Sequence, residues 1–345
     1  MKTTQLLKGI LFLGGTLAAF SPSIHAQAIP FTKGRIAMSS DGNHHDPDDI
    51  AASATALGMI AAAGLKDEFV LYTYADHVWS NRRNQRSLMI NSVTGTASRL
   101  GFDTTKFVVA VDDPEGAFND MRDVILDSTA ESPLIILAAG PMEVIGQGLD
   151  RAKAINPAAL DHVRVVSHSK WNNNHADNPL SDDNPQHSGW TWDEMIEEFE
   201  VNGVHFDKIV DQNANASVEI GFSTKKLEGT TNADWSDPES IVWQPWNFMR
   251  DYSAHTPEIN DGIQFIYSQW FDVVGFPDGS DAGMAYYMIT GNELGGPAGL
   301  KALFDNGFQG FPRPYLNDGA PRSIPGRLEA EDFNLGGQGL SLIHI

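Results

Sequence analysis

The chain has 345 residues, a formal net charge of −22 and no cysteine. Hydrophobic residues make up 41% of the sequence, which is enough for a sizeable core and excludes global disorder. The negative charge argues against nucleic acid as a partner, because binding phosphates requires clustered lysine and arginine. Without cysteine, the fold cannot depend on disulfides, and the chain has no thiolate nucleophile or thiolate metal site.

The first 28 residues have the pattern of an export signal. Lys2 and Lys8 give a positive start, residues 9–20 form an apolar stretch, and residues 26–28 (Ala-Gln-Ala) offer a cleavage site. The apolar stretch is short for a bilayer span, although a membrane anchor is the alternative. We therefore expect a secreted or periplasmic protein that has no membrane contact after cleavage of the signal.

Segments after the signal alternate between strand-like and helix-like patterns. Short, near-continuous apolar runs predict strands at 34–40, 68–74, 106–111, 133–139 and 162–167, with a further candidate at 205–210. Amphipathic or alanine-rich segments predict helices at 48–64, 81–100, 114–128, 142–155, 191–200, 281–290 and 297–304. The alternation indicates an α/β fold, a mainly parallel, Rossmann-like open sheet with helices on both faces.

Two stretches lack this alternation. The region 171–192 is rich in Asn, Asp, His and Trp, and its composition predicts a long functional loop. Between 212 and 260 the periodicity weakens, and the sequence places no element there. We expect one α/β domain over 29–311, followed by a linker at 312–323 that is rich in Pro, Gly and Asn.

The most distinctive segment lies between the first predicted strand and the first predicted helix. It contains four aspartates, Asp41, Asp46, Asp48 and Asp49. In open α/β sheets, ligands bind at the carboxyl ends of the strands, which is where this segment falls. Crowded carboxylates repel one another unless protons or a cation neutralise them, and calcium takes several oxygen ligands. The alternative is helix capping, although capping requires only one aspartate.

The run Asp46-Pro47-Asp48-Asp49 resembles the aspartate-rich loop after the first strand of the nucleoside hydrolases. It is closer still to the nucleoside-hydrolase-like, sugar-binding family, in which the loop ends in an acid-Pro-Asp-Asp run. A second segment, 135–142, is similar to the fourth strand of these proteins, which ends in a Gly-Pro turn before a helix. The resemblance covers residues 34–310 and implies a calcium-dependent hydrolase of an N-glycosidic bond.

The resemblance also implies roles for individual residues. Asp48 matches the acid that binds sugar hydroxyls, and Asp41 matches the acid that both binds calcium and activates water. The loop is one residue longer than in the closer family, so Asp46 is a second candidate for the catalytic base. The calcium ligands that the resemblance implies are Asp41, Asp49, the backbone carbonyl of Ala139, and Asp281.

Polar residues follow the fifth predicted strand. At the carboxyl end of a strand, such residues are candidates for binding sugar hydroxyls or donating a proton: His168, Lys170, Asn172, Asn173, Asn174 and His175. Of these, Asn172, Asn173 and His175 are the predicted sugar-binding residues. The alternative is an ordinary polar loop whose side chains bond to its own backbone. Four tryptophans could stack on sugar faces, or they could pack in the core: Trp79, Trp171, Trp190 and Trp192.

The end of the sequence carries a separate signal. Residues 324–333 resemble the opening strand of a family-6 carbohydrate-binding module, a β-sandwich far longer than the residues that remain. We therefore expect 324–345 to be the truncated start of such a module. Coincidence within a linker is the alternative.

Two hypotheses about function follow. The first is an exported, calcium-dependent hydrolase that acts on the glycosidic bond of a sugar or glycoside. The second is a non-catalytic carbohydrate-binding protein that keeps the calcium site. Ser280 favours the second, because nucleoside hydrolases often place a histidine at that position to protonate the leaving base. The sequence indicates neither the sugar nor an oligomeric state.

Overall fold

The computed structural model describes residues 31–43, 46–79, 85–174, 189–213, 221–225 and 233–308. The predicted signal, linker and module start lie outside the described residues, and so does His175. The described residues therefore belong to the predicted α/β domain at 29–311.

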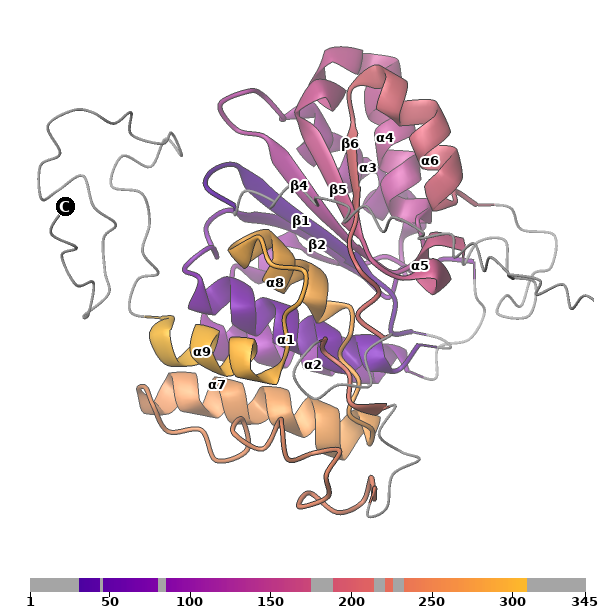
Figure 1. Cartoon of the computed structure of the whole chain (residues 1–345). Helices are drawn as coiled ribbons and strands as arrows, with labels where there is room; N and C mark the ends of the chain where they lie inside the picture. Colours follow the sequence, from indigo (N-terminus) through magenta and orange to yellow (C-terminus); the bar gives the residue numbers. More distant parts are fainter. Residues whose placement is uncertain are drawn as a thin grey trace, which may run out of the picture.

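These residues form a six-stranded sheet in which every paired strand is parallel to its neighbour (Figure 1). The strands are β1 (Arg35–Ser40), β2 (Phe69–Tyr74), β3 (Phe107–Val109), β4 (Leu134–Ala139), β5 (Val163–Ser167) and β6 (His205–Lys208). They lie in the order β3-β2-β1-β4-β5-β6, which is the Rossmann order. The predicted fold class is confirmed, and each predicted strand is present.

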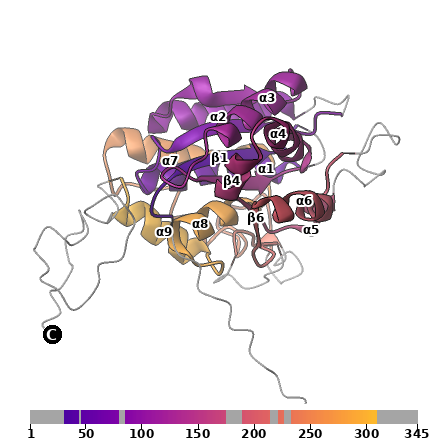
Figure 2. The same ribbon diagram turned by 90° about the horizontal axis from the view of Figure 1, so that it is seen from above.

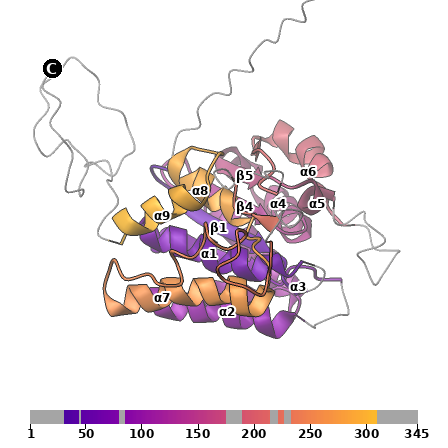
Figure 3. The ribbon, with the colours of Figure 1, turned by 60° about the horizontal axis from the view of Figure 1, so that its bottom comes forward.

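Helices cover both faces of the sheet. One face carries α1 (Asp48–Ala62), α2 (Arg86–Leu100), α7 (Pro257–Ser268), α8 (Ala282–Thr290) and α9 (Pro297–Asn306). The other carries α3 (Pro114–Leu126), α4 (Glu143–Ile155) and α6 (Trp192–Phe199). Figure 2 shows α3 beside α4, and Figure 3 shows α7 running along α2. No helix of the described ranges is both long and apolar enough to cross a membrane.

Each central strand contributes side chains to two separate cores. In β1, Ile36 and Met38 pack with α1 and its neighbours, whereas Ala37 packs with the layer of α3 and α4. Burial on both faces explains why the strands are near-continuously apolar in sequence. Helix α1 is buried along its whole length, and Gly64, one residue beyond the C-cap Ala63, has φ +68°, a left-handed conformation that favours glycine.

The structure differs from the sequence prediction in two places. The predicted loop at 171–192 begins with a short helix, α5 (Lys170–Asn174). Its sequence did not predict a helix, because it is rich in asparagine, which has a poor helix propensity. The region 212–260, where no element was placed, contains the start of α7, which continues into a π-helix, η6 (Gln269–Val274). Short 3-10 helices complete the described elements: η1 (Thr104–Lys106), η2 (Pro157–His162) and η4 (Glu200–Asn202).

Candidate functional site

The aspartate-rich segment lies at the point where the strand order of the sheet reverses. The chain adds β2 and β3 on one side of β1, and β4 to β6 on the other. Asp41 directly follows β1, and Ala139, the last residue of β4, pairs with Ser40. Ligands of open α/β folds bind in the crevice at this topological switch point, outside the carboxyl ends of the strands. Predicted site residues from two strands therefore meet at this edge.

Gly140 allows the chain segments at this edge to approach closely. A Cβ atom on Gly140 would lie 2.6 Å from the backbone nitrogen of Asp41 and 2.6 Å from Oδ1 of Asp76. Both distances are too short for a side chain, so only glycine fits between the ends of β1 and β2. The Gly-Pro turn that the sequence singled out is thus part of the site's framework.

Three aspartates of the segment form a compact cluster. Asp41, Asp46 and Asp49 each offer a carboxylate oxygen, and these oxygens lie within 4.8 Å of one another. Asp41 and Asp49 are fully buried, and Asp46 is partly exposed. Asp48 is also buried and belongs to the first turn of α1. The cluster, called the acid triad from here on, has the oxygen-rich composition of a site that could hold a metal ion.

Helix capping does not explain these acids. The N-cap residue of α1 is Pro47, and no side chain makes a capping hydrogen bond there. Asp48 and Asp49 lie in the first turn, where the helix dipole favours negative charge by about 0.3–1 kcal/mol at exposed sites. That gain is small against the cost of burying charged carboxylates, so the capping alternative is wrong.

Asp49 has a high electrostatic cost, because its side chain is fully buried. Both of its carboxylate oxygens are buried, and neither has a hydrogen-bond partner among the described residues. Leaving a buried polar group without a partner costs about 1–3 kcal/mol, and more when the group is charged. A carboxylate in such surroundings is stable only with a proton or with a cation beside it.

The pKa values of the segment reflect this environment. Burial raises the pKa of Asp46 to about 7; a hydrogen bond with Asp48 opposes the rise, and the charge of Asp41 adds to it. Burial, followed by the charge of Asp46, raises the pKa of Asp48 well above its usual value. Burial, followed by the charge of Asp281, does the same for Asp49. Without a cation, the cluster therefore retains protons near neutral pH.

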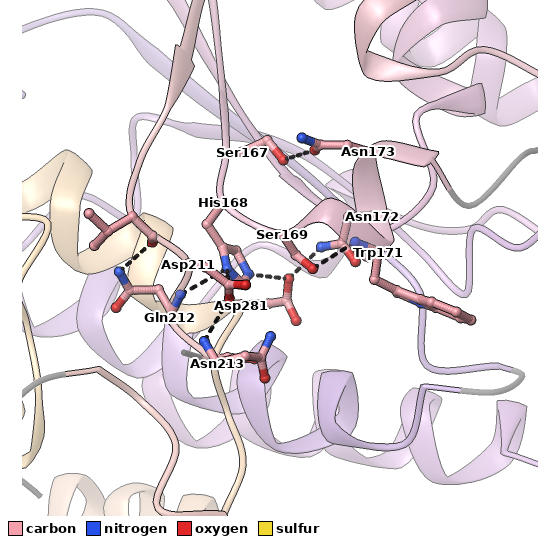
Figure 4. Close-up of polar contacts among 12 residues, drawn as sticks. Ser167, His168, Ser169, Trp171, Asn172, Asn173, Asp211, Gln212, Asn213 and Asp281 are labelled. Atoms are coloured by element: carbon pink, nitrogen blue, oxygen red, sulfur yellow. Dashed lines mark hydrogen bonds and ion pairs between the residues drawn. The ribbon is translucent and has the colours of Figure 1, made fainter. Parts of the chain in front are cut away.

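A second group of polar residues surrounds Asp281, which precedes α8 (Figure 4). His168 Nε2 lies 2.9 Å from Asp281 Oδ1, and Asn172 Nδ2 donates to the same oxygen at 2.6 Å. His168 follows β5 and Asn172 lies in α5, so both donors come from the segment directly after β5. All three side chains are buried. This second group is called the Asp281 cluster.

His168 is held between two carboxylates. Its Nδ1 lies 3.7 Å from Asp211 Oδ1 and 3.3 Å from the backbone nitrogen of Gln212. Burial lowers the pKa of His168, but the charge of Asp281 and the contacts with Asp211 outweigh it and raise the pKa to about 9. In the cation both ring nitrogens carry protons, and in the neutral form Gln212 N–H would donate to Nδ1. Nε2 donates to Asp281 in either state.

Comparison with known proteins gives this chain a relative. It is 30% identical over 272 residues to a protein of Formosa agariphila named Uncharacterized protein P22, a match that spans 76% of this chain and 86% of that protein. The chain belongs to the family of that protein. No family model matches the chain, and no solved structure does so either. The name of the relative states no activity.

The other predicted site residues differ in where they lie. Asn173 contacts Ser167 and, with its amide turned over, also accepts a hydrogen bond from Lys208. Its side-chain hydrogen bonds thus go to residues other than Asp281. Asn172 contacts Asp281, whereas its predicted role in binding sugar stays a prediction. The structure brings Asp41, Asp46, Asp48, Asp49 and Ala139 to the switch point.

Two residues of this region were not predicted as site residues. Asp76 follows β2 and is fully buried, with its Oδ2 accepting from Ser39 at 2.6 Å; burial raises its pKa to about 8. Asp278 is buried too, and burial followed by the charge of Asp48 raises its pKa to about 7. His168, by contrast, is one of the polar residues that the sequence singled out after the fifth predicted strand. Asp76 lies two residues after a predicted strand, which is the signal that could have identified it.

The tryptophans that could have stacked on sugars have unequal exposure. Trp192 is buried in the core beside α3 and α4, which excludes it as a platform. Trp171 is 38% exposed and lies next to Asn172 in α5. Of these two, Trp171 is the exposed one, and Figure 4 shows its side chain extending away from Asp281.

Proposed function

We propose that this protein is a calcium-dependent hydrolase that acts on a glycosidic bond. The observation that supports this proposal best is the acid triad at the switch point, together with the two partnerless oxygens of buried Asp49. A fold gains nothing from burying such carboxylates, so their arrangement is best explained by a ligand that carries positive charge.

Calcium fits this donor set better than other common ions. All the available ligands are hard oxygen atoms, and calcium accepts six to eight of them in flexible geometry. Asp41, Asp46 and Asp49 would supply carboxylates, and the carbonyl of Ala139 and the carboxylate of Asp281 are the further ligands that we propose. Zinc prefers nitrogen and sulfur ligands, which the acid triad lacks.

The acids of the cluster would then divide the chemistry among them. Bound calcium supplies positive charge that lowers the pKa of a water molecule at the site. Asp41 would accept the proton of that water as general base, and Asp46 is the second candidate for this role. Asp48, at the first turn of α1, would accept hydrogen bonds from sugar hydroxyls. Water would attack an anomeric carbon that carries positive charge in the transition state, while the bond from that carbon to the leaving group breaks and its electron pair goes to the leaving group.

The bond to be cleaved follows from resemblance rather than geometry. The nucleoside-hydrolase-like motifs at 46–49 and 135–142 favour an N-glycosidic bond. The module-like residues at 324–333 favour a sugar from a polysaccharide and, together with the signal-like residues 1–28, an exported protein.

One observation favours a second function, a carbohydrate-binding protein that has no catalytic activity. Ser280 occupies the place where nucleoside hydrolases often have a histidine that protonates the leaving group. Ser280 is buried, and its hydroxyl has no hydrogen-bond partner in the part of the chain that the structure describes. A serine hydroxyl is a poor acid and cannot take over the role of that histidine. Without another general acid, the protein could cleave only substrates whose leaving group departs without being protonated.

A kinetic experiment separates these functions. Hydrolysis of nitrophenyl ribosides and nitrophenyl O-glycosides is measured with the wild type, Asp41→Asn, Asp46→Asn and Asp48→Ala, each with calcium and with a chelator. Loss of a positioned base typically lowers the rate by about 10²–10⁴-fold, so Asp41→Asn should lose kcat. Asp48→Ala should mainly raise KM, because its proposed partners are hydroxyl groups.

Calcium content is measured in each variant, so that loss of the ion is not mistaken for loss of the base. If Asp41→Asn keeps full kcat with calcium bound while Asp46→Asn does not, Asp46 is the base. A wild type that binds a sugar but hydrolyses neither N- nor O-glycosides would leave the binding protein as the function.

A further inference from the structure

The Asp281 cluster is built to hold one carboxylate in one orientation. Both donors, His168 Nε2 and Asn172 Nδ2, contact the same oxygen, Oδ1, at 2.9 and 2.6 Å. Figure 4 shows the second oxygen of Asp281 pointing away from these donors. Two hydrogen bonds to a single oxygen prevent the carboxylate from rotating and leave the second oxygen available to a ligand.

We infer that His168 and Asn172 are positioning residues, which orient Asp281 toward a calcium ion held by the acid triad. The inference rests on the proposed calcium-dependent function and adds two residues to it. Groups that hydrogen-bond to metal ligands fix the orientation of those ligands and usually matter almost as much as the ligands themselves.

Further contacts hold the two donor residues, His168 and Asn172, in place. Asp211 and the backbone nitrogen of Gln212, which both follow β6, face Nδ1 of His168. Asn172 is fixed by α5, whose first turn is stabilised by a hydrogen bond from Trp171 N to Ser169 Oγ at 3.0 Å. The ends of β5 and β6 thus converge on a residue at the start of α8, and the side chains involved are buried apart from Asp211.

Asn172 has a natural control next to it. Asn173 is the same residue type, lies in the same short helix, and is 2% exposed, as Asn172 is. It hydrogen-bonds to Ser167 and not to Asp281. Removing either amide should disturb α5 to a similar extent, but only removal of the Asn172 amide changes the surroundings of Asp281.

The experiment measures calcium affinity and does not depend on activity. The full chain is freed of metal with a chelator and titrated calorimetrically with calcium chloride, as wild type, Asn172→Ala, Asn173→Ala, His168→Ala and His168→Gln. The thermal stability of each metal-free variant is measured in parallel. We expect Asn172→Ala to raise the Kd for calcium by about 10–100-fold and Asn173→Ala to leave it within about threefold of wild type.

The histidine pair tests the donor itself. His168→Gln keeps an N–H group able to reach Asp281 and should retain most of the affinity that His168→Ala loses. Because His168 is buried, either variant can fail to fold, and the asparagine pair then decides the question alone. Unchanged affinity in Asn172→Ala, or an equal loss in Asn173→Ala, would overturn the inference while the proposed function stands. A wild type that binds no calcium would overturn both.

Discussion

The acid triad and the Asp281 cluster lie at the same edge of the sheet, but their buried carboxylates differ in what surrounds them. Asp281 has two donors on one oxygen, one of them a histidine whose pKa is raised to about 9. Asp49 has no hydrogen-bond partner on either oxygen within the described residues. The protein itself offsets the charge of Asp281, whereas the charge of the triad must be offset by protons or by a bound ion.

The comparison predicts opposite effects for the same chemical change at the two places, and the larger effect belongs to Asp281. Asp281→Asn removes the charged partner of His168, and breaking a buried ion pair typically costs about 3–5 kcal/mol. We expect the metal-free variant to lose that much unfolding free energy, measured by urea denaturation at pH 8 with chelator present. A loss below about 1 kcal/mol, the level of an exposed ion pair, would show that His168 and Asp281 are not a coupled buried pair.

Asp49→Asn should have the opposite sign. Replacing a partnerless buried carboxylate by a neutral amide of the same shape should stabilise the metal-free protein by about 1–3 kcal/mol at pH 8. The same variant should lose the increase in melting temperature that calcium gives the wild type, because a ligand bound only by the native state stabilises it. If Asp49→Asn destabilises the metal-free protein, the carboxylate has compensation inside the fold, and the contrast with Asp281 fails.

The pH dependence of stability gives a smaller effect. A carboxyl whose pKa is higher in the folded than in the unfolded state stabilises the fold fully at low pH and loses that contribution as pH rises through the folded pKa. Asp46 and Asp278, with pKa values of about 7, and Asp76, at about 8, are such groups. The contribution of these three carboxyls to the unfolding free energy of the metal-free protein should therefore decrease as the pH rises from 5 to 8.

A variant of Asp76 measures the contribution of a single carboxyl to this pH dependence. Asp76→Asn keeps an acceptor for Ser39 but cannot titrate, so its stability should fall less steeply than that of the wild type. The difference in slope should be about 1.4 kcal/mol per pH unit between pH 5 and 7, the value for one proton. Parallel pH profiles for the two proteins would mean that Asp76 is ionised throughout this range.

The sequence predicted the scaffold well, for reasons that these residues illustrate. Strand β1 and helix α1 are buried on nearly all sides, so their apolar runs stand out without any knowledge of their partners. The acid triad was visible because its members are close in sequence, and its place at the switch point follows from the strand order. Alternation and spacing are local properties, which is why the sequence alone predicts these elements.

Contacts between distant segments could not be predicted. The pairing of His168 and Asn172 with Asp281 joins residues more than a hundred positions apart, and no pattern in either segment predicts it. The asparagine-rich sequence of α5 indicated a loop, although tertiary contacts such as that of Asn173 with Ser167 hold a helix there. Asp278 lies three residues before Asp281 in sequence, but only the fold brings it close enough to Asp48 for their charges to interact.

The central claim is that the acid triad receives its compensating charge from a calcium ion. A crystal structure of the protein grown with calcium, with the anomalous signal of the ion measured, tests it most directly. We predict one peak per chain, about 2.3–2.6 Å from carboxylate oxygens of Asp41, Asp46 and Asp49 and with Asp281 oriented toward it. A triad that remains without an ion at millimolar calcium and neutral pH, with its carboxyls hydrogen-bonded to one another, would contradict the claim.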